Sequence, residues 1–120
     1  MTIILKNKET LILEDFKFYC SVGKNGLTKN KLEGDKKTPK GFFKIGNLYY
    51  RKDRLKKPNT KLKCISIKKN MGWCDDPKDK KNYNKLIKVN KKKKFEKLYR
   101  KDNKYDLFIP ILYNSKNNNP

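Results

Sequence analysis

The chain has 120 residues, a mass of 14.3 kDa and a formal net charge of +21, with 33 Lys and Arg against 12 Asp and Glu. This length accommodates one domain and excludes a second. Because charged residues make up 38% of the chain and hydrophobic residues 35%, we expect a thin core.

The N-terminal third predicts short strands joined by turns. Residues 2–5 and 10–13 are apolar runs on either side of a polar turn at residues 7–9, which is typical of a hairpin. Residues 16–22 alternate, so that Phe16, Phe18, Cys20 and Val22 share one face of a strand, and we expect this face to lie in the core.

Residues 33–43 read Glu-Gly-Asp-Lys-Lys-Thr-Pro-Lys-Gly-Phe-Phe and predict a rigid loop between strands. Gly34 admits a positive φ, the Asp35 side chain can hydrogen-bond its own turn, and Pro39 fixes φ before Gly41. An ordinary surface turn would use the same residue types.

Further strands are predicted in the second half of the chain. Residues 42–50 form one, with Gly46 as a candidate bulge, and residues 61–68 form a half-exposed one. Residues 105–113 form the last, in which Pro110 removes a backbone donor and indicates an edge or an irregular site.

One helix is predicted, over residues 93–101. Phe95, Leu98 and Tyr99 have i, i+3, i+4 spacing, which gives one apolar stripe to pack on a sheet. The whole order of elements predicts a mainly β, sandwich-like domain with one short helix.

Several motifs recur in a fixed order: Tyr-Tyr-Arg-Lys-Asp-Arg at 49–54, Asn-Met-Gly-Trp-Cys-Asp-Asp-Pro at 70–77, Asn-Tyr-Asn at 82–84, Arg-Lys-Asp-Asn-Lys-Tyr-Asp at 100–106, and Tyr-Asn at 113–114. Together with the 33–43 loop, they resemble the bacterial L,D-transpeptidase catalytic-domain family over about residues 19–113. The resemblance implies the same sandwich-like fold.

The resemblance also implies a chemistry. Members of this family are cysteine acyltransferases of peptidoglycan, in which a thiolate attacks a stem-peptide carbonyl, forms a thioester and passes the acyl group to an amine. In the family, the catalytic histidine and a Ser-x-Gly-Cys or Thr-x-Gly-Cys motif lie C-terminal to everything matched here. The 120 residues contain no histidine, so they cannot form a Cys-His pair.

We therefore expect residues 1–120 to be a single partial domain, C-terminally incomplete and inactive alone, with no catalytic residue of its own. A gene fragment is the favoured explanation, and a natural truncation stays open. Of the three cysteines, Cys20 and Cys64 fit a core, whereas Cys74 sits in a matched motif away from the family's nucleophile position. No cysteine pair has metal-ligand spacing, and no cofactor is expected.

The resemblance indicates a cleft built from eight residues. Arg51 would pair with a substrate carboxylate through its planar fork, Trp73 would form an apolar wall, and Asp75 with Asp76 would meet a substrate amine. The complete set is Tyr50, Arg51, Arg54, Trp73, Asp75, Asp76, Tyr83 and Asn84. Each has a structural alternative: the tyrosines as core aromatics, the arginines paired with Asp53 or Asp76, the acids and Asn84 in turns.

The implied partners are peptidoglycan stem peptides in the cell envelope or periplasm. We find no secretory signal, because Lys6 and Lys8 interrupt the N-terminal apolar run, and no stretch long enough for a membrane span. The charge leaves a second interpretation open, a small basic protein that binds RNA or another polyanion without catalysis. Against it, only three of the basic residues are arginines: Arg51, Arg54 and Arg100.

Overall fold

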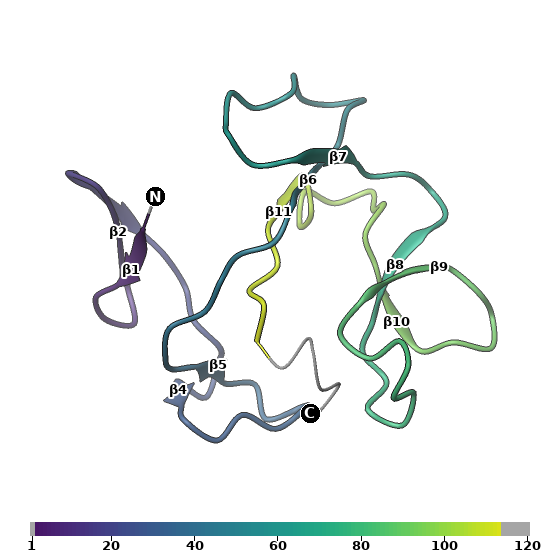
Figure 1. The fold of residues 1–120 in the computed structure, drawn as a ribbon, viewed down its shortest axis with the longest axis horizontal. Helices are drawn as coiled ribbons and strands as arrows, with labels where there is room; N and C mark the ends of the chain where they lie inside the picture. Colours follow the sequence, from purple (N-terminus) through teal and green to yellow (C-terminus); the bar gives the residue numbers. More distant parts are fainter. Residues whose placement is uncertain (1, 114–120) are drawn as a thin grey trace. The chain divides into compact units, whose positions relative to one another are not determined.

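The computed structural model describes residues 2–113, and all the regular structure within them is β-strand. Eleven short strands form four small sheets, and no helix occurs in this range (Figure 1). This confirms the mainly β prediction. Accordingly, no described helix is long and apolar enough to cross a membrane. The sandwich arrangement and the single domain over 1–120 stay predictions, because the chain divides into two compact units, Met1–Phe42 and Phe43–Pro120.

The first unit begins with an antiparallel sheet in the order β1-β2-β3, formed by β1 (Ile3–Leu5), β2 (Thr10–Leu13) and β3 (Phe16–Tyr19). The predicted hairpin is confirmed, and the Asn7 side chain closes its turn by accepting a hydrogen bond from the Glu9 amide at 2.9 Å.

The predicted core face of the third strand is wrong in part. The strand ends at Tyr19, Cys20 is only half-buried, and Phe16 and Phe18 are 64% and 49% exposed. Within this unit the three strands form a single layer, so alternation alone does not bury one face.

The first part of the predicted 33–43 loop lies between β4 (Leu27–Thr28) and β5 (Thr38–Pro39), which pair in parallel. The prediction is wrong for Thr38 and Pro39, which are themselves strand residues. Gly34 adopts a φ of +81° in open space. The Asp35 carboxylate accepts hydrogen bonds from the amides of Leu32 at 2.9 Å and Lys37 at 2.8 Å. The sequence pattern therefore identified both the loop and the residues that close it.

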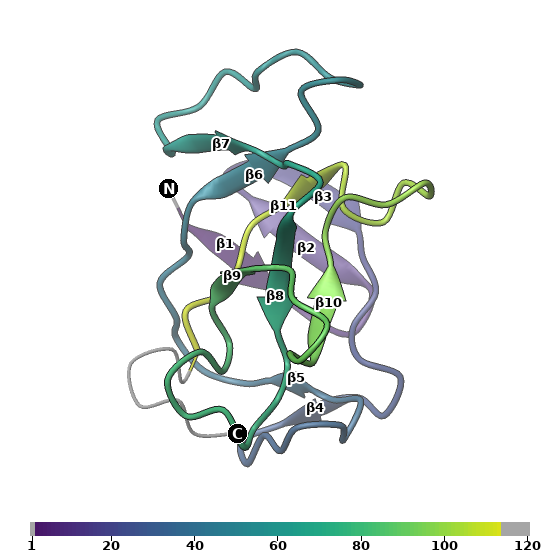
Figure 2. The ribbon, with the colours of Figure 1, turned by 90° about the vertical axis from the view of Figure 1, so that its right-hand side faces the viewer.

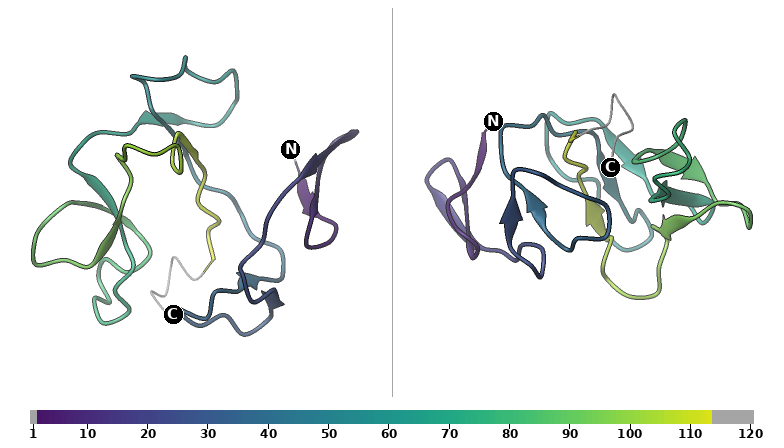
Figure 3. Two further views of the ribbon diagram at one scale, coloured as in Figure 1. Left: turned by 180° about the vertical axis from the view of Figure 1, so that it is seen from behind. Right: turned by 90° about the horizontal axis from the view of Figure 1, so that it is seen from below.

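The second unit holds two three-stranded sheets. In one, β6 (Leu48–Tyr50) lies between β11 (Leu107–Phe108), antiparallel, and β7 (Cys64–Ser66), parallel. In the other, β8 (Met71–Cys74) lies between β9 (Leu86–Lys88) and β10 (Phe95–Lys97), both antiparallel (Figure 2). Figure 3 shows these strands and the connections between them from behind and from below.

The predicted helix over residues 93–101 is wrong, because this segment forms β10 instead. Phe95 pairs with Cys74 and Lys97 with Gly72 on β8. A turn at Asn90, whose side chain accepts a hydrogen bond from the Lys92 amide at 3.0 Å, occupies the residues that would begin the helix. The apolar spacing is satisfied by a strand followed by a bend, which buries Leu98 at 1% exposure.

Three other predicted strands are shorter than expected. Only Leu48–Tyr50 of residues 42–50, Cys64–Ser66 of residues 61–68 and Leu107–Phe108 of residues 105–113 are strands. An isolated bridge joins Ile45 to Ile111. Gly46 is not a bulge but a close approach: its amide donates to the Pro110 carbonyl at 2.8 Å, and a Cβ there would lie 2.9 Å from the Pro110 ring.

The core of the second unit forms around the buried side chains of Tyr49, Ile67 and Leu98. Phe108 joins the two sheets, since its ring lies 5.6 Å from that of Tyr49 and 5.3 Å from that of Trp73. The tilted and edge-on ring geometry is the arrangement that aromatic pairs prefer. Strands from both sheets are thereby fixed beside the predicted site.

Candidate functional site

Arg51 directly follows β6 and is buried, at 3% exposure. Its Nε and Nη2 atoms donate to the two carboxylate oxygens of Asp53 at 2.9 and 2.8 Å, and its Nη1 atom donates to the Arg100 carbonyl at 2.6 Å. The guanidinium lies 3.7 Å from the centre of the Tyr99 ring. The fork that was predicted for a substrate carboxylate therefore holds Asp53, which matches the structural alternative for this residue.

This pairing changes the acidity of both partners. The hydrogen bonds from Arg51 lower the pKa of Asp53 to about 2, and those to Asp53 raise the pKa of Arg51 above its usual range. Both groups are thus charged at neutral pH.

Arg54 fixes the loop that precedes β11. Its guanidinium donates to the Asp106 carboxylate at 2.7 Å and to the backbone carbonyls of Asp102, Lys101 and Arg100 at 2.8, 2.9 and 3.1 Å. Two arginines of one motif therefore clamp residues 100–106, the segment that carries another matched motif.

A cavity of about 300 Å³ opens beside this clamp. Six of its lining residues are basic and the seventh is aromatic: Arg51, Arg54, Lys69, Lys97, Arg100, Lys101 and Tyr99. Arg100 is itself paired with Asp102 at 2.8 Å, which lowers the pKa of Asp102 to about 2. None of the acidic residues that the structure describes lines the cavity.

Trp73 and Asn84 form a second group of predicted residues. The Trp73 indole donates from Nε1 to the Asn84 Oδ1 atom at 2.9 Å, and the Asn84 Nδ2 atom donates to the Tyr113 carbonyl at 2.9 Å. Asn84 has a φ of +58°, a left-handed conformation that asparagine tolerates better than most residues. It therefore joins three separate motifs at one point.

The residues between Trp73 and Asn84 make a compact turn. Asp76 accepts a hydrogen bond from the Lys78 amide at 3.0 Å, as its turn alternative predicts, and Tyr83 is buried at 4% exposure. Asp75 differs, because its Oδ1 atom is buried and has no hydrogen-bond partner among residues 2–113. Buried carboxylate oxygens normally have one.

The structure thus places the eight predicted residues in one unit but in two groups. Tyr50, Arg51 and Arg54 belong to β6 and the clamp, whereas the other five lie on β8 and the turn after it. Tyr50 is buried at 7% exposure. Phe108 contacts Trp73 and pairs with Tyr49 on β6, and so connects the two groups.

One known protein family has a model that matches almost the whole chain. The family model YkuD, described as the L,D-transpeptidase catalytic domain, matches residues 1–114. The chain belongs to the L,D-transpeptidase catalytic-domain family. This confirms the resemblance seen over residues 19–113. Neither the search of curated proteins nor that of solved structures found a match.

The three thiols of this L,D-transpeptidase-family chain differ in exposure. Cys74 is buried at 1% exposure, Cys20 and Cys64 are half-buried, and all three are free. The sequence has no histidine to serve as their base. Within residues 2–113, no group of three or more acidic or cysteine side chains is placed to hold a metal ion.

Sequence reasoning missed five lining residues of the basic cavity: Lys69, Lys97, Tyr99, Arg100 and Lys101. Arg100 and Lys101 belong to a matched motif, so their place in it was a usable signal. Lys69 and Lys97 carried none, because lysine is spread over the whole chain. Tyr99 was assigned to a helix stripe that the structure replaces with β10 and a bend.

Proposed function

We propose that this chain supplies the scaffold and part of the substrate cleft of an acyltransferase that acts on peptidoglycan stem peptides, and that the 120 residues do not transfer acyl groups alone. The family supports the substrate class. The proposal that the 120 residues are inactive alone rests on one combination: Cys74 is buried, and the sequence lacks histidine.

The chemistry explains why that combination matters. In the transfer, the thiol gives its proton to a base, the thiolate adds to the peptide carbonyl, and the departing amine takes a proton as the thioester forms. A second amine then attacks the thioester and restores the thiol. A thiol that substrate cannot reach and that has no imidazole base performs neither step efficiently.

The proposed cleft role uses the Trp73 group. The Trp73 ring would give an apolar wall held in place by Asn84, at a donor distance of 2.9 Å. The unpartnered Oδ1 atom of Asp75 would accept a hydrogen bond from a substrate ammonium group, which would satisfy a buried oxygen. Asp76, Tyr83, Tyr50, Arg51 and Arg54 would position this surface through the turn and the clamp.

Two measurements test the proposal. In the first, the purified chain is incubated with a soluble stem peptide and an amine acceptor, and mass spectrometry follows thioester adducts and exchanged peptides. We expect neither. Unaided exchange would contradict the scaffold role.

The second measurement uses Trp73, the single tryptophan of the chain, as a fluorescent reporter of stem-peptide binding. We expect a saturable change in emission that Asp75→Asn weakens about tenfold, because a charge-assisted contact is lost. Asp15→Asn, in the exposed turn after β2, is the matched control and should bind as the wild type does. An unchanged emission, together with failure to sediment with peptidoglycan sacculi, would reject the cleft.

A further inference from the structure

The basic cavity of the second unit has a charge excess in its wall. Each of its arginines is paired with a carboxylate: Arg51 with Asp53, Arg54 with Asp106 and Arg100 with Asp102, at 2.7 to 2.8 Å. Arg100 also pairs with Glu96 at 3.5 Å. Most of the arginine donors are directed at these acids and at backbone carbonyls. The arginines therefore build the wall and leave little capacity for a ligand.

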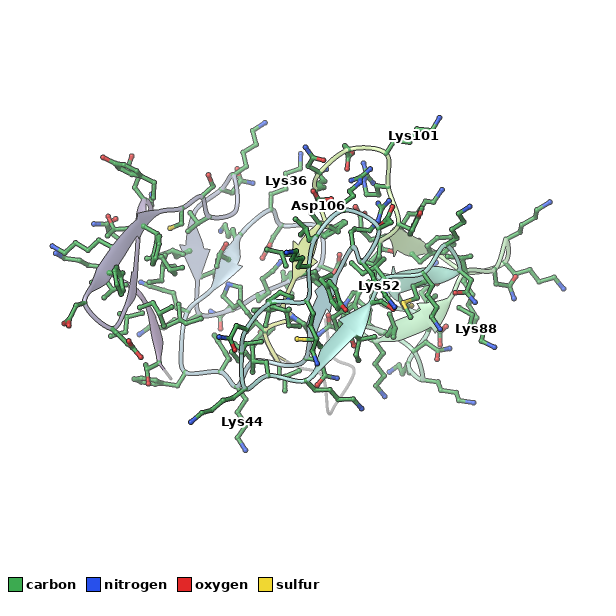
Figure 4. All side chains as sticks on the ribbon, turned by 90° about the horizontal axis from the view of Figure 1, so that it is seen from above. Lys36, Lys44, Lys52, Lys88, Lys101 and Asp106 are labelled. Atoms are coloured by element: carbon green, nitrogen blue, oxygen red, sulfur yellow. The ribbon has the colours of Figure 1, made fainter. Side chains whose placement is uncertain are left out.

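The lysines of the cavity are in a different state. Neither Lys69 nor Lys97 has an ion pair or a side-chain hydrogen bond to any residue in the range 2–113. Lys69 lies in the turn before β8, and Lys97 pairs with Gly72 on that strand through β10. Strand pairing thus holds the two lysine backbones on neighbouring elements at one cavity. Lys101, the third lysine of the wall, likewise has no ion pair or side-chain hydrogen bond within residues 2–113, and its side chain extends outward from its loop (Figure 4).

We propose that this cavity is a binding site for a phosphate group in its dianionic form. Six cationic side chains line the cavity and four carboxylates pair with its arginines, so about two positive charges stay unbalanced. A phosphate monoester carries roughly −1.5 to −2 at neutral pH, which matches this excess. A carboxylate carries only one negative charge. Lysine ammonium groups bind phosphate as point charges, without the planar match that arginine needs. A volume of about 300 Å³ admits such a group with a small substituent.

The wall is rigid enough to hold a small anion. The Tyr99 ring stacks on Arg51 and its hydroxyl donates to the Asp53 carboxylate at 3.3 Å, so one cation and one acid are fixed together. Binding is reversible and involves no covalent step. Arg51 and Arg54 form part of its wall, and phosphate binding requires neither acyl transfer nor a stem peptide.

The test compares inorganic phosphate with acetate at equal ionic strength, using isothermal titration calorimetry on the full chain at pH 7.5. We expect saturable phosphate binding and at least tenfold weaker acetate binding. The double variant Lys69→Gln/Lys97→Gln should weaken phosphate binding tenfold or more. The matched control is Lys44→Gln/Lys88→Gln, which removes the same charge from exposed positions outside the cavity and should change the affinity less than twofold.

Three results would overturn the proposal. Acetate binding as tight as phosphate would make the site a carboxylate site, which would instead fit a stem-peptide terminus. Equal losses in the two double variants, for phosphate or for generic RNA, would show diffuse surface charge. Absence of saturable phosphate binding would show no site. Circular dichroism checks that the variants fold, and the single variants Lys69→Gln and Lys97→Gln replace the double variant if it does not.

Discussion

Arg51 lies at the end of β6, where all three of its guanidinium nitrogens donate hydrogen bonds and its plane stacks on Tyr99. Its neighbour Lys52 is exposed. Two adjacent cations therefore have opposite roles: one is an internal tie between β6 and the 100–106 loop, and the other is part of the solvated surface. A lysine in place of Arg51 would keep the charge but lose the fork and the stacked plane.

We expect Arg51→Lys to lower the free energy of unfolding by about 2 kcal/mol, because a buried cation loses its two-point contact with Asp53 and its bond to the Arg100 carbonyl. Urea unfolding followed by Trp73 fluorescence measures this change. Lys52→Arg is the matched control and should alter stability by less than about 0.5 kcal/mol. Equal, small effects for both variants would show that the clamp does not stabilise the unit.

Residue-level prediction from the sequence succeeded where the partner is close along the chain. The alternative pairing of Arg51 with Asp53 joins two residues that are two positions apart in the sequence, and the structure shows this pair. Arg54 pairs with Asp106, a choice that depends on β11 lying next to β6. The Trp73 bond to Asn84 likewise depends on how the intervening turn closes. Local chemistry was predictable, whereas long-range pairing required the topology.

At the scale of elements, β8 is the strand on which most of the site depends. It was singled out as a motif but not as a strand, because its sequence Met-Gly-Trp-Cys contains a glycine, which weakens the strand pattern. The structure shows what the glycine does. A Cβ at Gly72 would lie 2.7 Å from the Phe95 ring and 3.3 Å from Val89, so the absent side chain makes room for the phenylalanine of β10.

The same pair explains why the helix prediction failed. An i, i+3, i+4 pattern gives only the spacing of apolar residues, and a three-residue strand with a bend satisfies it equally. The favourable site for Phe95 is the space above Gly72 on a neighbouring strand, which a helix over residues 93–101 would not reach in this register. Tertiary packing decided the local structure.

We expect Gly72→Ala to destabilise the chain by about 1–3 kcal/mol, since the methyl group would overlap the Phe95 ring in a packed sheet. Adding Phe95→Leu should recover part of this loss, so that the double variant costs less than the sum of the two single variants by about 1 kcal/mol. Chemical denaturation of the four proteins measures the coupling. Strictly additive costs would mean that the two residues do not contact each other as described.

At the scale of the whole molecule, the chain has far fewer Asp and Glu side chains than Lys and Arg side chains, 12 against 33. The pKa values of Asp35, Asp53, Asp79 and Asp102 are each lowered to about 2, mainly by hydrogen bonds from Lys31, Arg51, Lys93 and Arg100. These pairs occur in both units of the chain. Each ion pair on the surface is weakened by salt and contributes little to folding stability by itself. Their combined effect is therefore measured from the dependence of folding stability on pH.

The predicted dependence of stability on pH follows from these shifts. Because the folded pKa values lie below the ordinary value of 3.8, the unfolded chain takes up protons first on acidification, so the stabilisation is complete above about pH 5 and is lost as pH falls from about 4 to 2. The sequence has no histidine, so the thermal midpoint should be flat from pH 5.5 to 7. Circular dichroism melts recorded from about pH 2 to pH 7 measure both the acid loss of stability and the flat region of the thermal midpoint. Asp53→Asn/Asp102→Asn should show a shallower acid limb than the wild type, and a midpoint that already declines above pH 5 would contradict the assignment of acid stability to these pairs.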